Sequence, residues 1–220
     1  MKHFSFLNKQ QILSYTKIRR FETKLGERVR CISLGSNVEE ALQQPSIKFV
    51  VFGIAEDIGV KANGGIGGTH TAWSAFLSSF LNTQSNDFLD GSEILMLGNF
   101  DFHSLEEVIE KNAEKADEKL DAYRHAVNTI DEAVEQLMHI ITQNKKMPIV
   151  IGGGHNNSYP CIKGAAKGWH KAGVLELAQI NAINLDAHAD YRPMEGRHSG
   201  NGFRYADEDG YLEKYCVIGL

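Results

Sequence analysis

Two carboxylates and an imidazole alternate along one short stretch of the sequence, at Asp186, His188 and Asp190. Side chains two residues apart on an extended backbone face the same side. These three therefore converge if the extended geometry continues past the apolar residues 180–185. Two anions and an imidazole in one patch repel one another or lose solvation unless a cation lies between them. The spacing predicts a site for a divalent metal ion.

A second candidate ligand follows another apolar run. Residues 148–151 lead into three glycines, residues 152–154, and then into His155. Glycines allow a tight turn, and parallel α/β sheets bind ligands at the carboxyl ends of their strands. We therefore expect His155 on the same edge of the sheet as Asp186. The glycines match neither the dinucleotide nor the phosphate-loop motif.

The elements that must position these residues follow from the apolar pattern. Runs of strand length occupy residues 47–54, 93–97, 148–151, 180–185 and 215–220, whereas residues 71–81 and 105–142 have helical spacing. This alternation predicts a three-layer α/β/α domain with a mainly parallel sheet. Residues 105–142 contain no Pro or Gly, so one long helix and two shorter ones both stay open. We expect a single domain over residues 1–220, with residues 1–45 as a poorly defined lead-in.

Bulk composition excludes several classes of function. The 220 residues are 42% hydrophobic and 23% charged, which is typical of a globular domain. The net charge is −5 and the basic residues are dispersed, so we expect no nucleic-acid partner. No apolar stretch has the length of a membrane span or of a signal-peptide core, which predicts a cytoplasmic protein that does not enter a membrane. The three cysteines are scattered, so they predict neither a disulfide framework nor a paired metal site.

Together these motifs resemble the ureohydrolases, a family that includes arginase, agmatinase and formimidoylglutamase. Residues 153–155 resemble the first metal motif of the family and residues 186–190 the second. Residues 53–68 are similar to its glycine-rich first loop, and residues 199–201 to its substrate-contacting loop. The resemblance spans residues 47–220 and is greatest to the formimidoylglutamase branch.

The resemblance implies an arginase-like fold and a pair of Mn²⁺ ions. His155, Asp186 and Asp190 would hold one ion, and Asp186 would bridge to a second ion bound by His188. A hydroxide shared by the ions would hydrolyse a C–N bond of a small amidine or guanidino substrate, N-formimidoyl-L-glutamate in the formimidoylglutamase branch. The candidate substrate-binding residues are Arg192, Arg197, Ser199, Asn201 and Arg204.

The chain also departs from the family pattern. The third metal motif, Ser-x-Asp-x-Asp, does not occur in the sequence, so we predict one weakly held ion in place of a working pair. Phe203 occupies the place of the proton-shuttling histidine of arginase, which leaves His198 as the candidate catalytic histidine. Residues 215–220 predict either an exposed edge strand or a domain truncated after a strand.

Three readings of function stay open. The first is a formimidoylglutamase-like hydrolase, impaired in this 220-residue form. The second is an arginase-type or agmatinase-type guanidino hydrolase. The third is a non-catalytic assembly subunit whose unfinished sheet pairs with another chain, and the sequence also leaves a homo-oligomer open.

Overall fold

The computed structural model describes residues 1–32, 35 and 37–220. Its strands are β1 (Phe4–Phe6), β2 (Phe49–Ala55), β3 (Ile94–Asp101), β4 (Met147–Ile151), β5 (Ile180–Leu185) and β6 (Leu212–Ile218). Its α-helices are α1 (Lys9–Tyr15), α2 (Leu25–Arg28), α3 (Val38–Leu42), α4 (Ile58–Lys61), α5 (Ala72–Phe80), α6 (His103–Asn112), α7 (Ala116–Gln143), α8 (Ser158–Lys171) and α9 (Gly202–Glu208). Two 3₁₀ turns, η1 (Thr69–Thr71) and η2 (His155–Asn157), complete the set.

The main sheet has four strands in the order β1-β3-β2-β4. β2 pairs in parallel with both β3 and β4, and β1 pairs antiparallel with β3. The predicted strands 47–54, 93–97 and 148–151 correspond to β2, β3 and β4. Because β1 joins this sheet, part of the expected lead-in belongs to the fold. That residues 1–220 form a single domain stays a prediction.

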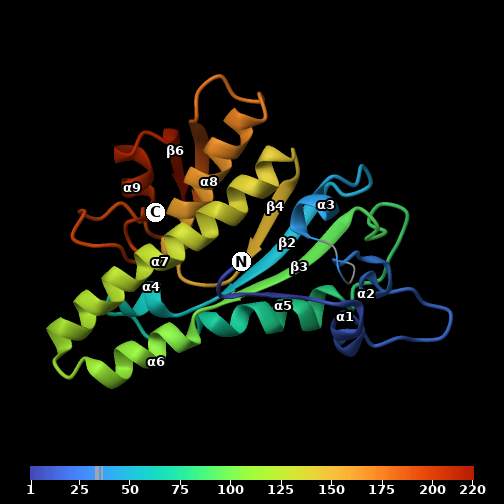
Figure 1. Cartoon of the computed structure of the whole chain (residues 1–220), viewed down its shortest axis with the longest axis horizontal. Helices are drawn as coiled ribbons and strands as arrows, with labels where there is room; N and C mark the ends of the chain where they lie inside the picture. Colours follow the sequence, from blue (N-terminus) through green and yellow to red (C-terminus); the bar gives the residue numbers. More distant parts are fainter. Residues whose placement is uncertain (33–34, 36) are drawn as a thin grey trace.

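Helices cover the main sheet on both faces, which gives three layers (Figure 1). On one face, Val50 and Phe52 of β2 pack with Val127 and Ile130 of the long helix α7. On the other face, Val51 packs in a second cluster with residues of α1, α2 and α5. The prediction of a three-layer α/β/α fold with a mainly parallel sheet is confirmed. The region 105–142 forms two helices, α6 and α7, with a break at residues 113–115.

Within residues 1–32, 35 and 37–220, a second, smaller sheet consists of β5 and β6, paired in parallel. One side of it packs in a cluster with α8 and α9 that includes Tyr159, Ile162, Phe203 and Leu212. The predicted strand 215–220 begins earlier, at Leu212, and ends at Ile218. Within the part of the chain that the structure describes, no helix is both long enough and apolar enough to cross a membrane.

Candidate metal centre

The turn after β4 delivers His155 to the carboxyl edge of the main sheet. Gly152 and Gly153 have φ of +83° and +79°, the left-handed region that side chains other than glycine rarely adopt. A Cβ on Gly153 would also lie 2.8 Å from the carbonyl oxygen of Ile54. The two glycines therefore let the chain turn sharply against β2, and His155 begins η2 immediately afterwards.

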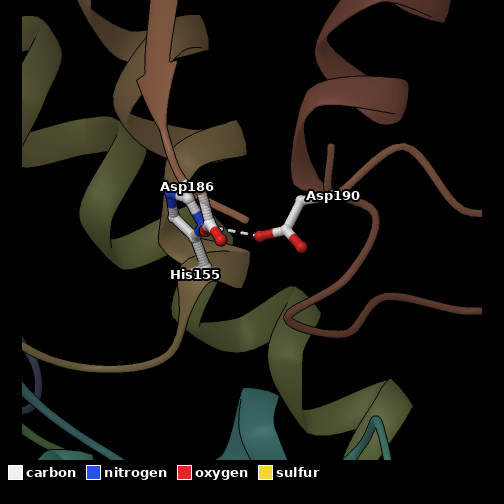
Figure 2. Close-up of side chains that lie close together, drawn as sticks. All are labelled: His155, Asp186 and Asp190. Atoms are coloured by element: carbon white, nitrogen blue, oxygen red, sulfur yellow. Dashed lines mark ion pairs between the residues drawn. The ribbon is translucent and has the colours of Figure 1, made fainter. Parts of the chain in front are cut away.

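The stretch after β5 supplies the two carboxylates. The imidazole Nδ1 of His155 lies 3.2 Å from Oδ2 of Asp186 and 2.5 Å from Oδ2 of Asp190. One potential ligand atom from each of the three residues lies within 4.8 Å of the others. Figure 2 shows the three side chains facing one another from two separate chain segments. An imidazole with two carboxylates is a donor set that suits Mn²⁺, Zn²⁺ or Fe²⁺.

Without a metal ion, Asp186 and Asp190 favour the protonated, charged form of the His155 imidazole. The hydrogen bond to Asp190 raises the pKa of His155, burial opposes this, and the charges of Asp190 and Asp186 add to the rise. The His188 backbone N–H donates to Asp186 over 3.0 Å and lowers the pKa of that carboxyl group. A proton on His155 thus occupies the place that a dication would take between the two anions.

His188 stands apart from this group of three. β5 ends at Leu185 and Asp190 has φ of +45°, so the extended geometry assumed from the sequence does not continue through residues 186–190. The side chain of His188 is 81% exposed, with Nδ1 3.3 Å from Oδ1 of Asp186. Its role as a ligand of a second ion stays a prediction.

A cavity of about 920 Å³ opens over the three residues. Of the predicted substrate-binding residues, Arg192 and Ser199 line it, together with Asn63 from the loop after α4. Arg192 donates from Nη1 to Oδ1 of Asn63 over 2.7 Å and from Nη2 to Glu195 over 3.0 Å. The guanidinium is therefore already oriented in the cavity wall.

The other predicted contacts lie outside the wall of this cavity. Arg197 is 3% exposed and forms an ion pair with Asp131. Arg204 pairs with Glu208 on the surface of α9. Asn201 is fully buried, and its side chain donates to the carbonyl oxygens of Pro193 and Gly196. None of these three residues lines the cavity in the part of the chain that the structure describes, and their role as substrate contacts stays a prediction.

His198, the candidate catalytic histidine, is also fully buried. Its Nδ1 accepts the N–H of Gly200 over 3.1 Å, and Nε2 lies 3.3 Å from Oε1 of Glu195. Burial lowers the pKa of His198. In this position the neutral imidazole supports the loop that carries Ser199, and it does not line the cavity.

Two buried carboxylates near the site are not among the predicted site residues. Glu56 is 2% exposed and directly follows β2, while Asp131 is 6% exposed within α7. Each had a detectable signal. Glu56 comes at the carboxyl end of a buried strand, and Asp131 stands four residues after Val127 and three before Val134, on the apolar face of its helix.

Comparisons with known proteins show the family to which this chain belongs. The sequence model of the arginase family matches residues 47–220. The formimidoylglutamase of Geobacillus sp. (strain WCH70) is 40% identical over 94 residues, which are 41% of this chain and 26% of that protein. The match to the family model covers most of the chain, and the protein belongs to the arginase family.

Solved structures show the same fold. The formiminoglutamase of Trypanosoma cruzi, solved with Mn²⁺, superposes with a TM-score of 0.57 at 23% identity, over 90% of this chain and 58% of that one. The formimidoylglutamase of Bacillus subtilis gives a TM-score of 0.60 at 18% identity, over 92% of this chain and 54% of that one. The chain thus spans little more than half the length of these solved relatives.

Proposed function

We propose that the protein is a formimidoylglutamase-like hydrolase that acts on the C–N bond of a linear amidine with the help of Mn²⁺. The observation that carries this proposal is the approach of His155, Asp186 and Asp190 from two chain segments to within 4.8 Å. Membership of the arginase family and the similarity to formimidoylglutamases support the reaction class. The substrates would be N-formimidoyl-L-glutamate and water.

The three residues would hold the ion, and each has a separate task. The carboxylates of Asp186 and Asp190 supply the negative charge, and His155 must lose its proton before it can bind. When bound, the ion supplies Lewis acidity and a water of lowered pKa. Two carboxylates leave the charge of two divalent ions only half neutralised, so we propose one weakly held ion for this chain.

Arg192 gives the cavity a preference for acidic substrates. A guanidinium binds a carboxylate through two parallel hydrogen bonds, and Arg192 is held in the cavity wall by Asn63 and Glu195. Formimidoylglutamate carries two carboxylates, whereas agmatine carries none. We therefore propose that Arg192 distinguishes the formimidoyl substrate from agmatine, whose tail ends in a cationic amine, with Ser199 beside it as a hydroxyl donor.

Titration calorimetry with Mn²⁺ and turnover assays test the proposal. We expect one binding event that His155→Ala and Asp186→Ala abolish and that His170→Ala, an exposed histidine at the end of α8, leaves unchanged. Arg192→Met should raise KM for formimidoylglutamate, whereas Arg204→Met removes the same charge outside the cavity and should not. Mn²⁺ binding that survives loss of His155, or equal turnover of arginine or agmatine, would contradict the proposal.

A second candidate function is favoured by one observation. The apolar side chains Ile183, Leu185 and Ile218 of the small sheet are 73%, 82% and 51% exposed. Such a face is suited to assembly with another protein surface. A non-catalytic assembly subunit would show concentration-dependent mass in analytical ultracentrifugation and no Mn²⁺-dependent turnover.

A further inference from the structure

The turn that carries His155 is held on its near side by Glu56. One carboxylate oxygen of Glu56 accepts the backbone N–H of Gly154 over 2.7 Å and the side-chain amide of Asn157 over 2.8 Å. The other oxygen accepts the N–H of Gly59 over 2.9 Å. Glu56 is 2% exposed, so these three N–H donors replace the water that its carboxylate loses on burial. The backbone of Gly154, the residue before His155, is thereby tied to the residue that follows β2.

The far side of the same turn is held by Arg197. Its Nη2 donates to the carbonyl oxygen of Asn156, the residue after His155, over 2.8 Å. Nε and Nη2 also donate to the two carboxylate oxygens of Asp131, over 2.8 and 3.2 Å. The guanidinium carbon lies 4.7 and 4.8 Å from the ring centroids of Tyr159 and Tyr205. These contacts fix Arg197 in one geometry.

We propose that Glu56 and Arg197 are positioning residues that aim the imidazole of His155 at Asp186 and Asp190. This positioning role rests on the proposed function, because the orientation of the His155 imidazole matters only if the three residues hold an ion. The two charged residues are 141 positions apart in the sequence, and they bind backbone groups of the residues that flank His155, the N–H of Gly154 and the carbonyl oxygen of Asn156. Neither residue lines the cavity. Their effect on a bound ion would pass through the backbone of the turn.

Removing a group that orients a metal ligand typically weakens metal binding 10–100-fold. Glu56→Gln keeps one oxygen acceptor. Its amide nitrogen faces either the N–H of Gly59, with one bond lost, or the N–H of Gly154 and the side-chain amide of Asn157, with two bonds lost. Arg197 also donates from Nη1 to Oδ1 of Asn201 over 2.8 Å. Arg197→Lys keeps the charge, but a compact ammonium lacks the planar fork that reaches Asp131, Asn201 and the carbonyl of Asn156 together. Both variants leave His155, Asp186 and Asp190 in place.

Calorimetry at a temperature well below the unfolding midpoint measures the Mn²⁺ affinity and tests the proposal. We expect about 10–100-fold weaker binding for Glu56→Gln and for Arg197→Lys. Ile141→Ala is the matched control, because Ile141 is fully buried in α7, ten residues after Asp131, and its truncation should lower stability alone. Affinity within twofold of the wild type in both positioning variants, at a stability loss equal to that of Ile141→Ala, would overturn the proposal.

Hydrogen exchange of the Gly154 amide separates this proposal from the proposed function. If the wild-type chain bound no Mn²⁺, the proposed function would fail, yet the hydrogen bonds that hold the turn could still be measured. In the metal-free protein we expect Glu56→Ala, which removes both acceptor oxygens, to speed exchange of the Gly154 amide at least tenfold while amides in α5 keep their rates. An unchanged rate at Gly154 would overturn the positioning role whether or not the protein binds metal.

Discussion

The two sheets of this protein differ in how completely they are buried. In β2, at the centre of the main sheet, Val50, Val51, Phe52 and Ile54 are at most 1% exposed. In β5, Ile183 is 73% exposed although it is also an aliphatic residue within a strand. β2 has a hydrogen-bonded strand on each side and helices on both faces, whereas β5 has one partner strand and packing on one face.

This difference divides the candidate metal centre between a rigid half and a less supported half. His155 follows β4 of the main sheet, and both Glu56 and Arg197 hold its turn. Asp186 and Asp190 follow β5 of the small sheet. The position of the imidazole is therefore set by the main core, while the carboxylates depend on a two-stranded sheet. Mutations in the two sheets should accordingly have unequal effects.

The largest effect is expected at the centre of the main sheet. Phe52 is fully buried between β2 and α7, and Phe52→Ala removes a ring from a closely packed core. We expect a loss of about 3–5 kcal/mol in the free energy of unfolding, measured by urea denaturation. Leu185→Ala in β5, 82% exposed, is the comparison and should cost far less. Equal losses for the two variants would mean that the sheets are equally buried in solution.

A carboxylate at the end of each sheet gives a second comparison. Burial raises the pKa of Asp57. The N–H of Gly68 and the hydroxyl of Thr69 donate to its carboxylate, and Nδ1 of His70 lies in hydrogen-bond contact with it. These contacts outweigh burial, so the pKa of Asp57 is lowered overall. The side chain of Asp57 is 7% exposed, against 27% for Asp186. Asp57 is therefore the more firmly held carboxylate, and its ionised form stabilises the fold.

Asp57→Asn should lower the free energy of unfolding by about 1.5–3 kcal/mol at neutral pH, since hydrogen bonds to a charged group are lost. The lowered pKa makes this stabilisation complete above the unfolded value of about 4 and removes it as the pH falls towards the folded value. Urea titrations at pH 7 and pH 3 should thus show the variant approaching the wild type in acid. Asp87→Asn, at an exposed residue, is the control and should differ little from the wild type at either pH.

The contact between α7 and α8 links the two halves, because α8 follows the His155 turn and supports the small sheet. A Cβ on Gly164 would lie 2.6 Å from the carbonyl oxygen of Glu135 and from Cβ of Met138, so the helices touch through their backbones. Gly164→Ala should cost about 1–3 kcal/mol by overpacking, measured by urea denaturation. Lys171→Ala, at the exposed end of α8, should stay within about 0.5 kcal/mol of the wild type. An unchanged free energy of unfolding for Gly164→Ala would show that α8 moves freely against α7.

The fold was predictable from the sequence where the signal is local. The apolar runs locate the strands, and the rule that ligands bind at the carboxyl ends of parallel strands predicts His155 near Asp186. The partners of Arg197 were not predictable, because Asp131 lies 66 residues away and nothing in the sequence joins them. The break in the extended geometry at Asp190 and the exposure of Ile183 also depend on tertiary neighbours that periodicity does not report.

The smallest effect is expected on the open face of the small sheet. Ile183→Thr keeps a β-branched side chain suited to a strand, and at 73% exposure it should change the free energy of unfolding by less than about 0.5 kcal/mol. Ile54→Thr in β2 is the matched control, because it places the same hydroxyl at a fully buried position and should cost several times more.

A large, concentration-dependent loss for Ile183→Thr would contradict this expectation. Such a loss would mean that another copy of the chain covers Ile183 in solution, because a self-association equilibrium makes stability depend on protein concentration. Sedimentation of the wild type and the variant at several concentrations distinguishes the two cases. A monomer in both would leave the carboxylates of the candidate metal centre on a sheet that only its own chain supports.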